Sequence, residues 1–210
     1  MYFADSMGFR VLGPTVSDKV VGSYWVLVGD SYSFGTFVDY EETFCALLDS
    51  AYLRVRILNR AQPGFGVDQM LFTLAESMKS NKFELVIVGL VDADFKRSLT
   101  AYRDFEGRQK RVLGLDNGKL FEKTEKDRPN DLFRWFDQNS RFYMGYKLAR
   151  RKLGYSYPIG PWWKVNEAII DSIASLVAES GSRVLFAYLP TKSWRPFLML
   201  HRFMKENILL

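Results

Sequence analysis

The sequence predicts an α/β protein in three layers, an α/β/α sandwich with helices on both faces of a central, mainly parallel sheet. Short apolar runs alternate with segments of helical periodicity, and most of these runs end in turn-forming residues. The chain has 210 residues, of which 48% are hydrophobic and 25% charged. Because that length and composition are sufficient for one substantial core, we expect residues 1–210 to form a single domain.

The first half of the chain contains the most regular part of this pattern. The predicted strands are residues 25–28, 55–58 and 85–88, and the predicted helices are residues 42–53 and a segment from Asp68 to about Met78. We expect the Asp68 carboxylate to cap the second of these helices. Ligands of such sheets bind beyond the carboxyl ends of the strands, so the loops that follow the three strands are the place to look for a site.

The second half is less regular between residues 96 and 163, which we interpret as an insertion rather than a second domain. Within it, Asp116-Asn117-Gly118 tolerates positive φ and predicts a β-hairpin over residues 112–121. A helix is expected around residues 131–152. The regular pattern then resumes with a helix over 165–179, closed by Gly181, and a strand over 184–189.

Composition excludes several classes of protein. The net charge of +5 comes without a nucleic-acid recognition module, so we expect no nucleic-acid partner. No apolar run reaches the ~18 residues that a membrane span requires, and the first residues do not form an export signal. Cys45 is the only cysteine, which rules out an internal disulfide and favours a reducing compartment, with the cytoplasm as the default location. We expect no cofactor and no metal, and the oligomeric state is not predicted.

Ser31 directly follows the first predicted strand, in the turn Gly29-Asp30-Ser31. A serine hydroxyl becomes a nucleophile when a base is close and hydrogen-bond donors face the oxygen that gains negative charge. A turn that leads into a helix offers free backbone N–H groups for that purpose. On these residues alone, a serine that merely caps a helix is the alternative.

A second polar loop follows the second predicted strand. It has the sequence NRAQPGFGVDQ over residues 59–69, and its glycines Gly64 and Gly66 allow the backbone to approach a ligand closely. Together with VLVGDSYSFG over residues 26–35, this loop resembles the first two sequence blocks of the SGNH/GDSL hydrolases. Residues 8–10 resemble the lead-in of one bacterial branch, and residues 85–97 resemble the third block. This resemblance implies a flavodoxin-like sandwich.

The same resemblance implies roles for three residues. Ser31 would be the nucleophile, and its own N–H and that of Gly64 would be two of three donors to the oxyanion. Asp30 would mainly order the turn. The third donor in the family is an asparagine, and Ala93 stands at its position.

The catalytic base of the family is also not evident. The family has an Asp-x-x-His block near its C-terminus, whereas the single histidine here, His201, follows Leu198 at the aspartate position. A histidine in an apolar segment is more often structural, so we expect the chain to lack this final block.

The sequence therefore favours a serine ester hydrolase that acts on an acyl or acetyl ester through an acyl-enzyme on Ser31, weak or truncated. The alternative is an inactive protein of the same fold that binds a glycan or an acylated polymer. A phosphate loop at residues 29–35 is disfavoured, because neither a G-x-G-x-x-G nor a Gly-Lys-Ser/Thr sequence occurs there. The basic residues 150–152 and the aromatic pair Trp162-Trp163 are interpreted first as a solvated helix face, and the alternative is a surface against which a sugar or an acyl chain lies.

Overall fold

The structure of the chain is a computed structural model, and it describes residues 2–11, 20–100, 110–123 and 161–189. The central sheet has the strand order β4-β3-β5-β8 in this part of the chain, and all of its neighbouring strands run parallel. Its strands are β3 (Ser23–Val28), β4 (Val55–Asn59), β5 (Leu85–Leu90) and β8 (Arg183–Tyr188). The predicted α/β class is confirmed.

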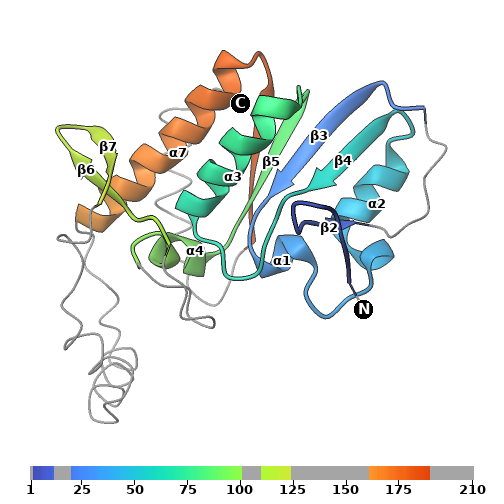
Figure 1. Ribbon diagram of the computed structural model, residues 1–210, viewed down its shortest axis with the longest axis horizontal. Coiled ribbons are helices and arrows are strands. Elements are labelled where there is room, and N and C mark those ends of the chain that lie inside the picture. Colours follow the sequence, from blue (N-terminus) through green and yellow to red (C-terminus); the bar gives the residue numbers. More distant parts are fainter. Residues whose placement is uncertain (1, 12–19, 101–109, 124–160, 190–210) are drawn as a thin grey trace, which may run out of the picture.

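Helices cover both faces of this sheet, as Figure 1 shows. One face packs against α3 (Val67–Ser80), α4 (Asp92–Arg97) and α7 (Pro161–Glu179). The other face packs against α2 (Phe44–Ala51). Alternation along β3 produces the two layers, because Val26 and Val28 point to the first core and Leu27 to the second. The three-layer arrangement is therefore confirmed.

The second, smaller core contains Cys45, the only cysteine of the chain. Its side chain is fully buried, and its Sγ lies 3.9 Å from the carbonyl oxygen of Ile57 in β4. Burial raises the pKa of the thiol to about 12. Cys45 therefore packs as a small apolar residue, as its apolar surroundings in the sequence predict.

The starts of three helices differ from the prediction, and one of them is α7, which begins at Pro161 instead of residue 165. The expected helix over residues 42–53 is a 3₁₀ turn, η1 (Tyr40–Glu42), followed by α2, because the Thr43 hydroxyl accepts a hydrogen bond from the N–H of Ala46 at 3.2 Å and caps the helix there. The expected cap of α3 by Asp68 is wrong. Gly66 is the N-cap residue, and the Asp68 carboxylate is instead buried in an ion pair with Lys110.

Two short hairpins flank the sandwich. The predicted hairpin in the second half is confirmed as β6 (Leu113–Asp116) and β7 (Lys119–Glu122), with positive φ at Asn117 and Gly118. Leu113 and Leu120 pack it into the core beside α7 (Figure 1). An unpredicted hairpin at the N-terminus pairs β1 (Phe3–Ala4) with β2 (Arg10–Val11).

Several predictions lie outside the described residues. They are the helix over 131–152, the basic residues 150–152, His201, and the contacts of Trp162. No helix of the described part is both long and apolar enough to cross a membrane.

Candidate active site

Three loops meet at one end of the sheet, because the neighbouring parallel strands β3, β4 and β5 all end there. They are residues 29–31, residues 60–66, and the start of α4. In Figure 1, α4 and α1 (Ser31–Phe34) both lie at this end. The sequence predicted this grouping from strand order alone.

Ser31 is the first residue of α1, and Asp30 is the residue that caps it. The Asp30 Oδ1 accepts a hydrogen bond from the N–H of Tyr32 at 2.9 Å. The interpretation of Ser31 as a simple helix cap is therefore wrong, because the neighbouring carboxylate fills that role. The Ser31 Oγ lies 3.4 Å from Asp30 Oδ2, a long hydrogen bond that leaves the half-buried hydroxyl available to other partners.

Two glycines allow α1 to rest on the sheet. Gly29 and Gly89 follow the paired residues Val28 and Val88 of β3 and β5, and the side chain of Ser33 lies against both of them. A Cβ atom on Gly29 would stand 2.1 Å from Ser33 Oγ, and one on Gly89 would stand 2.2 Å from it. At Gly29 a Cβ would also stand 2.5 Å from the Ser33 Cβ, so a side chain there would displace α1, whereas at Gly89 the overlap is with the Ser33 hydroxyl. The glycine that follows both Val28 and Val88 was the sequence signal for this contact, and we did not predict it.

Asn59, at the end of β4, connects the second loop to α1. Its Nδ2 donates to the carbonyl of Ser33 at 3.1 Å, and its Oδ1 accepts from the N–H of Ala61 at 3.1 Å. Asn59 is almost completely buried, so both of these hydrogen bonds are shielded from water. The loop then reaches Gly64, whose φ of 78° lies in the left-handed region that favours glycine.

The backbone N–H groups of Ser31 and Gly64 are open. Neither group donates to an acceptor within the described part of the chain, and both residues are only half-buried. An N–H at the first position of a helix has no intrahelical partner, which accounts for the one at Ser31. The loops at this end of the sheet therefore carry a serine hydroxyl and two N–H donors that find no acceptor in the described ranges of the chain.

Arg97, in the last turn of α4, joins the site through a network of buried charges. Its Nη1 lies 3.0 Å from Asp30 Oδ2 and 2.9 Å from Asp94 Oδ1. Both carboxylates are almost fully buried. Burial, reinforced by the negative charge of Asp30, raises the pKa of Asp94 to about 8, although Arg97 and the N–H of Val91 act in the opposite direction.

The start of α4 places Ala93 between two acidic residues whose carboxylates are occupied. Asp92 accepts a hydrogen bond from the Tyr188 hydroxyl at the end of β8, and Asp94 binds Arg97. Ala93 itself is half-buried and has no side-chain donor. No group of three residues able to hold a metal ion occurs in residues 2–11, 20–100, 110–123 and 161–189.

The N-terminal hairpin supports the site from the other side of α1. The Arg10 guanidinium donates to the carbonyls of Phe34, Gly35 and Val38 at distances between 2.5 and 3.0 Å. The Arg10 side chain also lies over the ring of Tyr2, 4.3 Å from its centre. The sequence pointed to residues 8–10 only as part of a resemblance, and the contacts of Arg10 were not predicted.

Comparison with known proteins gives matches among solved structures only. No family model and no curated protein matches the chain. A crystal structure of AlinE4, an SGNH-hydrolase family esterase, is 26% identical over 41% of this chain and 48% of that chain, with a TM-score of 0.34. That match spans about half of the AlinE4 chain.

The chain is similar to solved SGNH-family esterases. A single-residue variant of AlinE4 is 17% identical, covering 92% of this chain and 97% of that chain with a TM-score of 0.36. A lipolytic G-D-S-L family protein from Veillonella parvula is 12% identical over 88% of this chain and 97% of that chain, with a TM-score of 0.34. Because these TM-scores are below 0.5, the fold assignment above depends on the sheet order and the two helix layers.

Proposed function

We propose that the protein is a serine ester hydrolase of the SGNH/GDSL type, and that residues 1–210 form one domain of that family. The observation that carries the proposal is the arrangement of Ser31. Its hydroxyl stands at the start of α1, at the sheet end where Gly64 also lies, and the N–H groups of both residues have no acceptor among the residues that the structure describes. A nucleophile and two backbone donors are the parts from which an oxyanion site is built.

The reaction follows from these parts. The Ser31 Oγ attacks the carbonyl carbon of an ester, and its proton passes to a base. The Ser31 and Gly64 N–H groups stabilise the negative oxygen, and the alcohol leaves with a proton to give an acyl-enzyme. Water then attacks the acyl group, which releases the acid and restores the Ser31 hydroxyl. Asp30 acts by holding the turn through its bond to the N–H of Tyr32.

The base in this proposal lies outside the described residues, which contain no histidine because His201 is the only one in the chain. The substrate class is a carbohydrate or lipid ester or another small acyl ester. Hydrolysis of nitrophenyl esters of increasing chain length distinguishes acetyl from longer acyl substrates.

The first test is covalent labelling of Ser31 with a fluorophosphonate probe. We expect the wild-type protein to be labelled and Ser31→Ala to lose the label completely. Ser50→Ala, which changes an exposed serine of α2, is the matched control and keeps the label. Labelling that is absent from the wild type, or that persists in Ser31→Ala, contradicts the catalytic proposal.

The second test restores the third donor. Ala93→Asn places an amide at the position where the family has its asparagine. Because one oxyanion donor contributes ~10²- to 10³-fold to turnover, we expect an increase in ester hydrolysis of at least ~10-fold. Ala93→Asp is the matched control, since an ionised carboxylate has the same shape and no donor. Equal rates for the two variants would contradict the role assigned to position 93.

The alternative function is a binding protein of the same fold, without catalysis, for a glycan or an acylated polymer. Ala93 favours this alternative, because it removes a donor that only the reaction needs. Here Ser31→Ala would leave binding of an acylated glycan unchanged in calorimetry, and neither Ser31 labelling nor the gain from Ala93→Asn would be seen.

A further inference from the structure

We propose that Arg97 is a positioning residue that holds the two backbone donors of Ser31 and Gly64 in one arrangement. The inference rests on the proposed function, and it assigns to a side chain of α4 a role that the three loops cannot fulfil separately. Arg97 does not touch the reacting atoms. It acts through Asp30 on one loop and through the carbonyl of Phe65 on another.

The contacts of Arg97 join all three loops at this end of the sheet. One guanidinium nitrogen, Nη1, lies 3.0 Å from Asp30 Oδ2, 3.4 Å from the Phe65 carbonyl and 2.9 Å from Asp94 Oδ1. Asp30 immediately precedes Ser31, and Phe65 immediately follows Gly64. Each proposed donor therefore has a direct neighbour in the chain that is bound by the same cation.

The backbone brings Arg97 to this place independently of its side chain. A Cβ atom on Gly66 would stand 2.5 Å from the backbone nitrogen of Ser98 and 2.9 Å from the carbonyl carbon of Arg97. The end of α4 and the glycine loop are therefore in contact without room for a side chain between them. This close approach fixes the distance from α4 to the loop, and Arg97 extends the contact to Asp30.

The charges explain why an arginine is suited to this position. Asp30 and Asp94 are 1% and 0% exposed, and the Arg97 side chain is 22% exposed. Removing the cation would leave two buried carboxylates facing each other. All three contacts come from Nη1, at the far end of the side chain. A lysine would keep the charge, but its ammonium ends one atom short of the position of Nη1 and cannot reach all three acceptors without moving a loop.

The experiment compares Arg97→Lys with Arg56→Lys. Arg56 is the matched control, because its side chain is partly buried to a similar degree and pairs with one aspartate, Asp49 of α2, while its place at the start of β4 is outside the three loops of the site. For fluorophosphonate labelling of Ser31, a displacement of the donors by about 1 Å predicts a ~10²-fold fall in the limiting rate for Arg97→Lys, with probe affinity within ~2-fold of the wild type. For Arg56→Lys, the limiting rate stays within ~2-fold. Thermal unfolding of both variants shows whether each remains folded.

A limiting rate unchanged in Arg97→Lys overturns the inference, and so does an equal fall in both variants. If Arg97→Lys does not fold, Arg97→Gln is labelled at a temperature where it is folded, with the same two criteria.

If the wild type is not labelled at all, the proposed function fails and the inference is decided by the amide signals of Ser31 and Gly64 in ¹⁵N spectra. Signals that move together in Arg97→Lys, and stay in place in Arg56→Lys, support it. Signals that stay in place in Arg97→Lys overturn it.

Discussion

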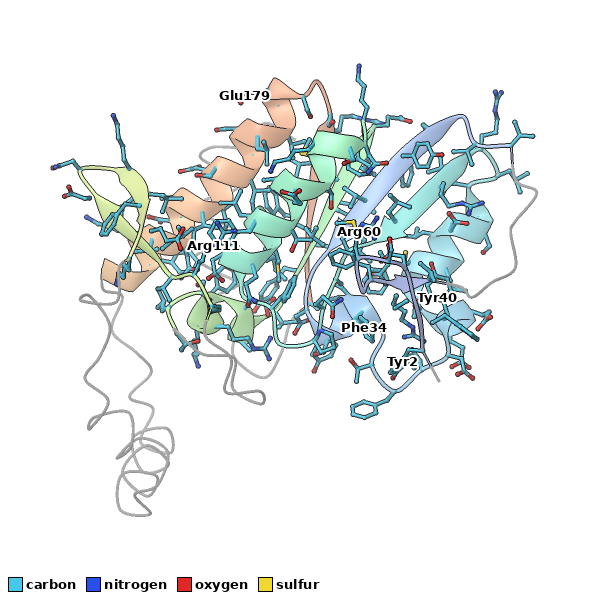
Figure 2. All side chains as sticks on the ribbon, viewed as in Figure 1. Tyr2, Phe34, Tyr40, Arg60, Arg111 and Glu179 are labelled. Atoms are coloured by element: carbon cyan, nitrogen blue, oxygen red, sulfur yellow. The ribbon has the colours of Figure 1, made fainter. Side chains whose placement is uncertain are left out.

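Two arginines hold α1 from opposite ends, and they do so with different partners. Arg10 lies at the C-terminal end, where it donates to backbone carbonyls and lies close to the rings of Tyr2, Phe34 and Tyr40, which Figure 2 shows grouped together. Arg97 lies at the N-terminal end and binds the carboxylates of Asp30 and Asp94. Both arginine side chains are largely buried, so hydrogen bonds and ion pairs with these partners take the place of water around each guanidinium charge.

The two ends of α1 differ in whether the groups that bind the arginine can gain or lose a proton. Backbone carbonyl oxygens do not titrate, so the hydrogen bonds that hold the Arg10 end of α1 are expected to be equally strong between about pH 5 and pH 8. The Arg97 end has two carboxylates for one cation, and burial, reinforced by the negative charge of Asp30, raises the pKa of Asp94. The contribution of Arg10 to the free energy of unfolding is therefore expected not to change with pH. The arrangement around Ser31, in contrast, is expected to depend on whether Asp94 is protonated.

The largest effect is expected when the contacts of Arg10 with the C-terminal end of α1 are removed. Arg10→Met removes the three hydrogen bonds to the loop after α1 and leaves buried carbonyls without a donor, which we expect to lower the free energy of unfolding by about 3 kcal/mol. Urea unfolding at about pH 5 and pH 8 measures this loss, which should be the same at both values. A loss that changes with pH would contradict the comparison of the two ends.

The next effect concerns the packing of α1 against the sheet. Gly89→Ala is expected to cost about 2 kcal/mol, because the new Cβ overlaps Ser33 Oγ. Ser33→Ala should restore most of this loss, since the Ser33 Cβ would stand 3.5 Å from the new atom. The same rescue should fail for Gly29→Ala, where that Cβ would stand only 2.5 Å away. Equal rescue at both glycines in urea unfolding would show that the Ser33 Cβ does not limit the approach at Gly29, and no rescue at Gly89 would show that the Ser33 hydroxyl does not determine the fit.

A further effect sharpens the contrast by pH. Because the pKa of Asp94 is raised to about 8 in the folded state, the folded protein keeps a proton that the unfolded chain has lost above its ordinary pKa near 4. The free energy of unfolding should therefore fall as pH rises from about 4 towards 8, by up to about 1.4 kcal/mol for each pH unit, and level off above that range. Asp94→Asn, which cannot titrate, should flatten this dependence. An unchanged slope in that variant would mean that another group produces it.

The smallest effect is expected from Ser33→Ala alone. The Ser33 hydroxyl is buried without a hydrogen-bond partner within the described part of the chain. Removing it should change the free energy of unfolding by less than about 1 kcal/mol, in the stabilising direction. A clear destabilisation in urea unfolding would show that the hydroxyl has a partner in solution.

The sequence predicted the elements that depend on neighbouring residues. Buried parallel strands are apolar runs, so β5 could be located from residues 85–88, and the hairpin turn could be read from Asn117 and Gly118. The strands β1 and β2 were missed because two residues are too short for any periodicity. Asp68 was assigned a local role as a cap, but Lys110, far along the chain, binds its carboxylate.

The features of the candidate site also divide into those that neighbouring residues determine and those that depend on distant residues. The positions of Ser31 and Gly64 followed from the ends of consecutive strands, which the order of elements determines. The contacts of Arg10 with the end of α1 and of Arg97 with Asp30 and Phe65 could not be predicted, because they join residues 24 to 67 positions apart. Such contacts depend on how the layers close, and the residues adjacent in the sequence do not specify that.

The buried thiol of Cys45 gives the protein a reporter of its own opening. A thiol reagent attacks the thiolate, and a pKa of about 12 leaves almost none of that form in the folded protein. Modification must therefore wait until α2 separates from β4 or the whole domain unfolds. The rate of modification in mild denaturant would measure how often the α2 layer opens. No engineered label is needed, because no second cysteine competes.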